Sequence, residues 1–72
     1  MGSREEQLQE AYKDFTSVWL FYRKYFDVSD SDEYWESVIQ EADALYKAIR
    51  TPLRRALLGV VTTELERRLK NE

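Results

Sequence analysis

The segment LQEAYKDFTSVWLFYRKYF, residues 8–26, decides the fold of this 72-residue chain. Apolar side chains recur along it at steps of four and three residues, which places them on one face of an α-helix. We call these six residues the aromatic stripe: Leu8, Tyr12, Phe15, Trp19, Tyr22 and Phe26. Six apolar side chains in one line need a partner surface, so a chain of this length is predicted to be a helical bundle.

The first helix has recognisable ends in the sequence. Ser3 and Glu6 form a capping box, in which the serine oxygen accepts a free backbone N–H and the glutamate returns the bond. The segment DVSDSD, residues 27–32, ends the helix because short polar side chains bond to the nearby backbone. The first helix is therefore predicted over about residues 4–26.

Two more helices follow. Either Asp30, in a capping box with Glu33, or one of the serines of the segment can cap the second helix. Thr51-Pro52 ends this helix, because proline disfavours helix at the residue before it. Proline also fits the first position of a third helix after a threonine cap. Since both connections are short, neighbouring helices run antiparallel. The predicted fold class is all-α: a small antiparallel up-down-up three-helix bundle with helices at about 4–26, 31–50 and 52–70.

Length and composition restrict the class of protein. Residues 1–72 allow a single domain, in which residues 1–3 are typical of a cloning remnant. The chain has no cysteine and no histidine, so disulfides, thiolate metal sites and the usual general base are absent. Its longest apolar run, residues 18–22, is far shorter than the about 20 residues that span a bilayer. The N-terminus also lacks a signal-peptide pattern, and we expect a soluble, cytoplasmic protein.

Catalytic and cofactor motifs are missing from the sequence. Its glycines are Gly2 and Gly59, too few for a phosphate-binding loop, and its serines have no histidine to activate them. The DVSDSD segment has the alternating oxygen ligands of a calcium loop, but Asp32 replaces the turn glycine and Val38 replaces the last carboxylate. We expect no enzyme, no metal site, no cofactor and no small-molecule substrate.

Charge is distributed unevenly along the chain. Residues 27–46 carry seven acids and no base, residues 47–72 carry seven bases and three acids, and the whole chain has a net charge of −3. The candidate acidic face of the second helix consists of Glu33, Glu36, Glu41 and Asp43. It either imitates phosphate charge in a DNA- or RNA-binding site of a partner, or is a solvated face partly neutralised by the basic third helix.

The third helix has the bases that nucleic-acid binding would need. They scatter around the helix rather than lining one stripe, so we do not expect direct nucleic-acid binding. Glu64 and Arg68 lie four residues apart beside the apolar face, and we expect them to form a salt bridge.

The first helix also carries apolar side chains outside the aromatic stripe. These and the adjacent bases are the candidate partner-binding residues: Leu20, Phe21, Arg23, Lys24 and Tyr25. One interpretation is an exposed binding surface with aromatic anchors and a basic rim. The other is that the first helix is central and buries Phe21 and Tyr25 against both other helices.

These features favour a non-enzymatic protein–protein interaction module. Its partner would be a second copy, in a homodimer, or a larger protein that it binds or inhibits. Two alternatives remain: an acidic nucleic-acid mimic that occupies a partner's binding site, and an engineered or generated helical scaffold without a native partner.

Overall fold

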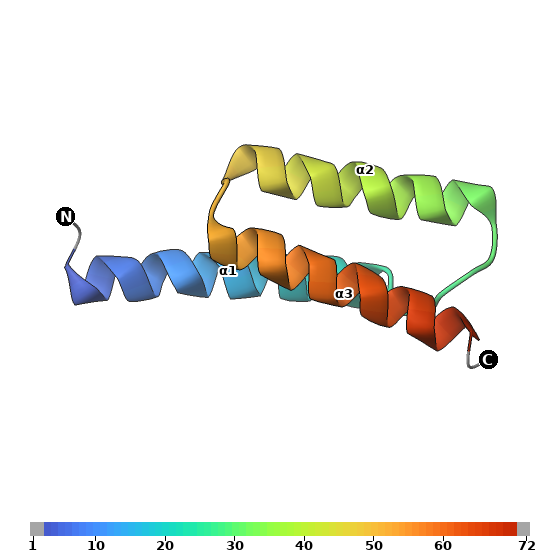
Figure 1. Ribbon diagram of the computed structural model, residues 1–72, viewed down its shortest axis with the longest axis horizontal. Helices are drawn as coiled ribbons and strands as arrows, with labels where there is room; N and C mark the ends of the chain where they lie inside the picture. Colours follow the sequence, from blue (N-terminus) through green and yellow to red (C-terminus); the bar gives the residue numbers. More distant parts are fainter. Residues whose placement is uncertain (1–2, 71–72) are drawn as a thin grey trace.

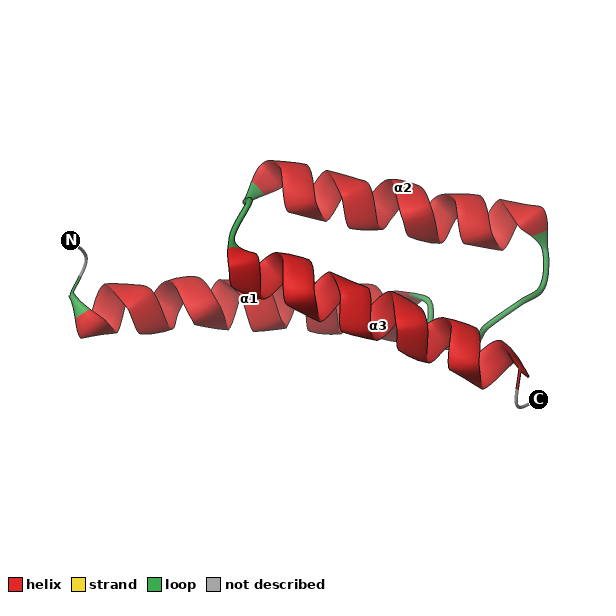
Figure 2. Ribbon diagram, in the orientation of Figure 1, coloured by secondary structure: helices red, strands yellow, loops and turns green. Residues whose placement is uncertain are grey.

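The computed structural model describes residues 3–70 and contains three α-helices, α1 (Arg4–Lys24), α2 (Asp32–Ala48) and α3 (Pro52–Lys70). The helices run up, down and up (Figure 1), and only short loops join them (Figure 2). The predicted all-α three-helix bundle is therefore confirmed, although α1 and α2 each end about two residues earlier than predicted. The expected cloning remnant falls mainly on residues 1–2, which lie outside the described residues.

Each helix begins at a hydroxyl side chain. The hydroxyl oxygens of Ser3, Ser31 and Thr51 accept the backbone N–H three residues further on, at 3.2, 3.1 and 3.0 Å. These bonds satisfy N–H groups that have no partner within the helix. The predicted caps Ser3 and Thr51 are confirmed, and Ser31 is the cap of α2.

The face that α1 buries is not the aromatic stripe. Val18 and Phe21 of α1 form the core with Val38 of α2 and with Leu58 and Leu65 of α3. Five of the stripe residues are exposed and Tyr22 is half-buried. The buried line is offset from the stripe by one residue, which is about 100° around the helix. The prediction that the stripe packs inside the bundle is wrong, although the bundle it implied is present.

A buried ion pair lies at the junction of the three helices. The Nε of Arg54 in α3 donates to Oδ1 of Asp14 in α1 at 2.8 Å, and both side chains are 3% exposed. The Thr51 hydroxyl donates to Oδ2 of the same carboxylate at 2.6 Å. Arg54 also donates through Nη1 to the Leu45 carbonyl of α2 at 3.0 Å and through Nη2 to the Ser17 hydroxyl at 3.3 Å.

This ion pair determines how α1 is rotated. A charge buried without a counter-charge costs several kcal/mol, so Asp14 and Arg54 must face one another once either is inside. Val18 and Phe21 follow Asp14 by four and seven residues on the same helix face, and they enter the core with it. The stripe is then left pointing away from the core.

The N-terminal part of α1 extends beyond the bundle. The bond between Thr51 and Asp14 places the start of α3 beside the middle of α1, and the blue end of α1 reaches past both other helices in Figure 1. Residues 4–10 are all exposed, and the molecule measures 44 × 21 × 16 Å. We call residues 4–10 the projecting segment.

Removing one member of the buried ion pair is expected to destabilise the fold strongly. Asp14→Leu and Arg54→Met each leave a buried charge unpaired, which lowers the free energy of unfolding by about 3–5 kcal/mol. The double variant should lose less than the sum, because no uncompensated charge remains. Urea unfolding followed by circular dichroism measures all three. If a single variant does not fold, recovery of the helical signal in the double variant supports the same conclusion. Strictly additive losses of the free energy of unfolding would contradict it.

Gly59 offers a test on the outer face of α3. Apart from the helix's own backbone, no atom stands within 4 Å of the position of an added Cβ. Since glycine inside a helix costs about 1 kcal/mol relative to alanine, Gly59→Ala should raise the free energy of unfolding by about 0.5–1 kcal/mol. Ala56→Gly, on the same face, is the matched control and should lower it by a similar amount. A loss of stability in Gly59→Ala would be incompatible with an open face here.

Candidate interaction surface

The aromatic stripe is the largest apolar feature on the outside of α1. Leu8, Tyr12, Phe15 and Trp19 are 57%, 71%, 54% and 57% exposed. They lie on successive turns, so their side chains form one continuous line. Contiguous exposed apolar surface of this kind is uncommon on a small protein, which makes the stripe a candidate interaction surface.

The stripe borders a shallow groove between α1 and α3. The groove has a volume of about 180 Å³, and its lining comes from Phe15, Val18, Trp19 and Tyr22 of α1 and Leu57 and Val61 of α3. All of these side chains are apolar apart from the Tyr22 hydroxyl. The groove therefore widens the apolar surface beyond α1 itself and can accept an apolar side chain from outside.

Arg68 closes the C-terminal end of the stripe. Its guanidinium carbon lies 3.9 Å from the centre of the Phe26 ring, and its Nη2 donates to the Phe26 carbonyl at 3.0 Å. The predicted Glu64–Arg68 salt bridge is wrong, since Glu64 pairs with Arg67 instead. The physical reason is that Arg68 gains a cation–π contact and a free carbonyl beyond the end of α1, while Arg67 reaches Glu64 from solvent.

The five predicted partner-binding residues do not share one exposed surface. Leu20 is 53% exposed, Arg23 and Lys24 are exposed, and Tyr25 is half-buried. Phe21 is only 1% exposed and packs in the core, so it cannot contact a partner. Of the two interpretations of Phe21, an exposed anchor or a residue buried by a central α1, the second is confirmed, because α1 packs against both other helices on the face that follows Asp14.

Tyr25 and Lys24 instead attach α1 to α2. Lys24 Nζ pairs with Glu41 Oε1 at 2.6 Å, and the Tyr25 hydroxyl lies 3.3 Å from the same oxygen. The Tyr34 hydroxyl donates to the Tyr25 carbonyl at 2.6 Å, and their rings meet edge to face at 5.7 Å. Burial raises the pKa of both tyrosine hydroxyls, and the Glu41 carboxylate raises the pKa of Tyr25 further. The hydrogen bond to Glu41 also raises the pKa of Lys24.

The candidate acidic face is partly neutralised, but not by α3. Glu41 pairs with Lys24 of α1, and Asp43 pairs with Lys47 of α2 at 2.8 Å. Within residues 3–70 no ion pair joins α2 to α3. Glu33 and Glu36 are exposed and form no ion pair in that part of the chain.

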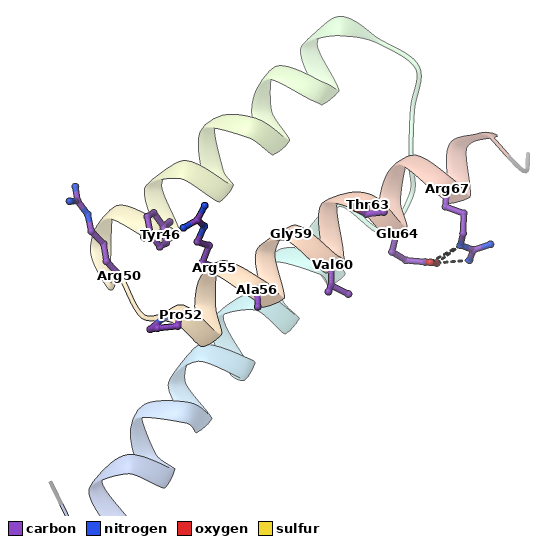
Figure 3. Close-up of a pocket in the computed structure, with 10 residues that line it drawn as sticks. All are labelled: Tyr46, Arg50, Pro52, Arg55, Ala56, Gly59, Val60, Thr63, Glu64 and Arg67. Carbon is purple, nitrogen blue, oxygen red and sulfur yellow. Dashed lines mark hydrogen bonds and ion pairs between the residues drawn. The ribbon is translucent and has the colours of Figure 1, made fainter. Parts of the chain in front are cut away.

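A second, wider groove runs along the outer face of α3 beside the end of α2, with a volume of about 900 Å³ (Figure 3). Arg50 and Arg55 lie at one end, whereas Arg67 lies at the other end and is held by Glu64. The polar groups therefore do not converge on one point. Over residues 3–70, moreover, no three His, Cys, Asp or Glu side chains gather closely enough to hold a metal ion.

No model of a known protein family, no curated protein and no solved structure matches this chain. None of the three helices described combines the length and apolar character needed to cross a membrane.

The free energy of unfolding is expected to fall above about pH 10. Because the pKa values of Tyr25 and Tyr34 are raised in the folded state, their stabilising contribution is complete below the unfolded value near 10 and is lost as pH rises through the folded values. Tyr34→Phe should make this alkaline loss shallower. Urea unfolding between about pH 8 and about pH 11 measures it, with the exposed Tyr12→Phe as the control for removing a tyrosine. An unchanged alkaline slope in Tyr34→Phe would contradict the assignment.

Proposed function

We propose that this chain is a non-enzymatic protein-interaction module that binds another protein chain through the aromatic stripe of α1. The observation that carries the proposal is the exposure of the stripe, which places large apolar side chains in one line outside a core that is already formed. The fold leaves this line free because the buried Asp14–Arg54 pair requires a different face of α1.

The energetics of such a surface favour binding. Burying a large apolar side chain contributes about 1.5–3 kcal/mol, and aromatic side chains dominate the binding energy of many interfaces. The stripe is also held on a helix whose C-terminal half packs on α3, so little ordering is needed when a partner binds. A second helix laid along the stripe and its groove is the binding mode that this shape suits.

The proposed contact differs from the site expected from the sequence. It uses Tyr12, Phe15 and Trp19 as anchors, whereas Phe21 and Tyr25 serve the core and the α1–α2 contact. Leu20 is exposed to nearly the same degree as Trp19 but lies about 100° around the helix from it. These two neighbours therefore form a matched pair for a test.

The alternatives have less support from the contacts. An acidic nucleic-acid mimic needs an open array of carboxylates, and two of the four candidates already pair with lysines. A scaffold without a partner gives no reason for large apolar side chains on the outside, which lower solubility. Salt concentration distinguishes the acidic mimic from the interaction module, because a complex held by charge weakens steeply as salt rises and one held by apolar contacts does not.

Photo-cross-linking in the cells that produce the chain tests the proposal. A benzophenone amino acid in place of Phe15 should give a covalent adduct with a protein, and the same probe in place of Gln40, exposed on α2, should give none. Adding Trp19→Glu should abolish the adduct, whereas Leu20→Glu should preserve it. Circular dichroism confirms that both variants fold.

The other outcomes of the photo-cross-linking experiment lead to different conclusions. An adduct with a second copy or with a different protein supports the module, and its mass tells them apart. An adduct that survives Trp19→Glu but not Leu20→Glu overturns the proposed surface in favour of the other flank of α1. An adduct formed only by a probe at Glu36 favours the acidic mimic, and no adduct from any position favours the scaffold.

A further inference from the structure

We infer that the occupant of the aromatic stripe is a second copy of this chain, seated antiparallel on α1 about a two-fold axis near residue 17. The inference rests on the proposed function, because it names the partner of the same surface. Three features of the molecule carry it: the spacing of the stripe together with the projecting segment, the net negative charge of that segment, and the exposed area.

The spacing of the stripe suits an antiparallel pair. Its steps of four, three, four, three and four residues read the same in both directions, with the centre at residue 17. In an antiparallel pair centred there, Phe15 of one copy faces Trp19 of the other and Tyr12 faces Tyr22, while Leu8 approaches Phe26, which follows the end of α1. The smallest member then meets an aromatic ring at each end, and two Phe15–Trp19 contacts flank the axis.

Only the antiparallel arrangement places the projecting segment against the bundle of the other copy. Residues 4–10 are the first turns of α1, and they have no other helix of their own chain beside them. An antiparallel pair lays the segment against the body of the other copy, beside Phe26 and Arg68. A parallel pair would leave two projecting segments with only each other as neighbours.

Charge disfavours the parallel orientation. The projecting segment carries three acids and one base. In a parallel pair the acidic segments would repel one another, which disfavours that alignment.

The exposed area matches what a dimer needs. A compact monomer of 8.7 kDa exposes about 4,700 Å², whereas this chain exposes 5629 Å². The excess is close to the about 800 Å² that each partner buries in an interface of standard size. The chain therefore exposes more surface than a compact monomer of its mass, by about the area that one partner buries in an interface of standard size.

Disulfide trapping tests the register. The chain has no native cysteine, so Leu8→Cys/Phe26→Cys introduces two exposed thiols at the ends of the stripe. Mild oxidation of the purified protein should give a covalent dimer in which peptide mapping finds the link between positions 8 and 26 of different copies. Glu10→Cys/Lys24→Cys is the matched control, because it has the same sum of positions on another face of α1, and it should form no covalent dimer.

Light scattering after size-exclusion chromatography supplies a second measurement on the unmodified chain. The mass should rise to twice 8.7 kDa with concentration. Trp19→Glu should raise the dissociation constant about 30-fold or more, while Leu20→Glu should leave it nearly unchanged.

The outcomes separate the two proposals. Links of position 8 to 8 and 26 to 26 overturn the antiparallel pair. A monomer at every concentration that also forms no trapped link overturns the homodimer but not the module, provided that photo-cross-linking at Phe15 captures a protein of different mass. If both experiments fail, the proposed function fails with the inference.

Discussion

The buried pairing of Asp14 with Arg54 is the interaction on which the rest of the structure depends. It brings an acid from α1 and a base from α3 into the core, and Arg54 reaches a carbonyl of α2 as well. Thr51 serves two purposes there, since it caps α3 and donates to Asp14. One polar cluster thereby sets the position of all three helices relative to one another, and the apolar side chains pack around that arrangement.

This constraint explains why the outside of the molecule is unusual for so small a domain. α1 offers two lines of side chains that could face a core, and the ion pair selects the line that contains Asp14. The richer aromatic line is excluded from the core, although burying it would contribute more apolar area. The core instead forms on the face of α1 that carries Asp14, and the aromatic stripe stays on the outside of the chain.

Much of the fold could be predicted from local patterns. The three hydroxyl caps and the proline after Thr51 act over three or four residues, so they located the helices closely. The buried face of α1 could not be predicted in the same way. Periodicity identifies lines of apolar residues, but it does not show that a line containing a carboxylate is the one that packs in the core. Asp14 and Arg54 are 40 residues apart in the chain, and no local signal connects them. For the same reason periodicity could not decide between an exposed and a buried Phe21, since its burial follows from that of Asp14.

The sequence by itself determined the number of helices, where they begin and the absence of cysteine and histidine chemistry, because these depend on neighbouring residues or on composition. Only the tertiary structure decided which side of α1 faces inward, which acids on α2 are neutralised and which arginine Glu64 binds. These choices depend on contacts between distant residues, whose free energies compete only when the three helices are assembled. The exposed aromatic stripe is a product of that competition.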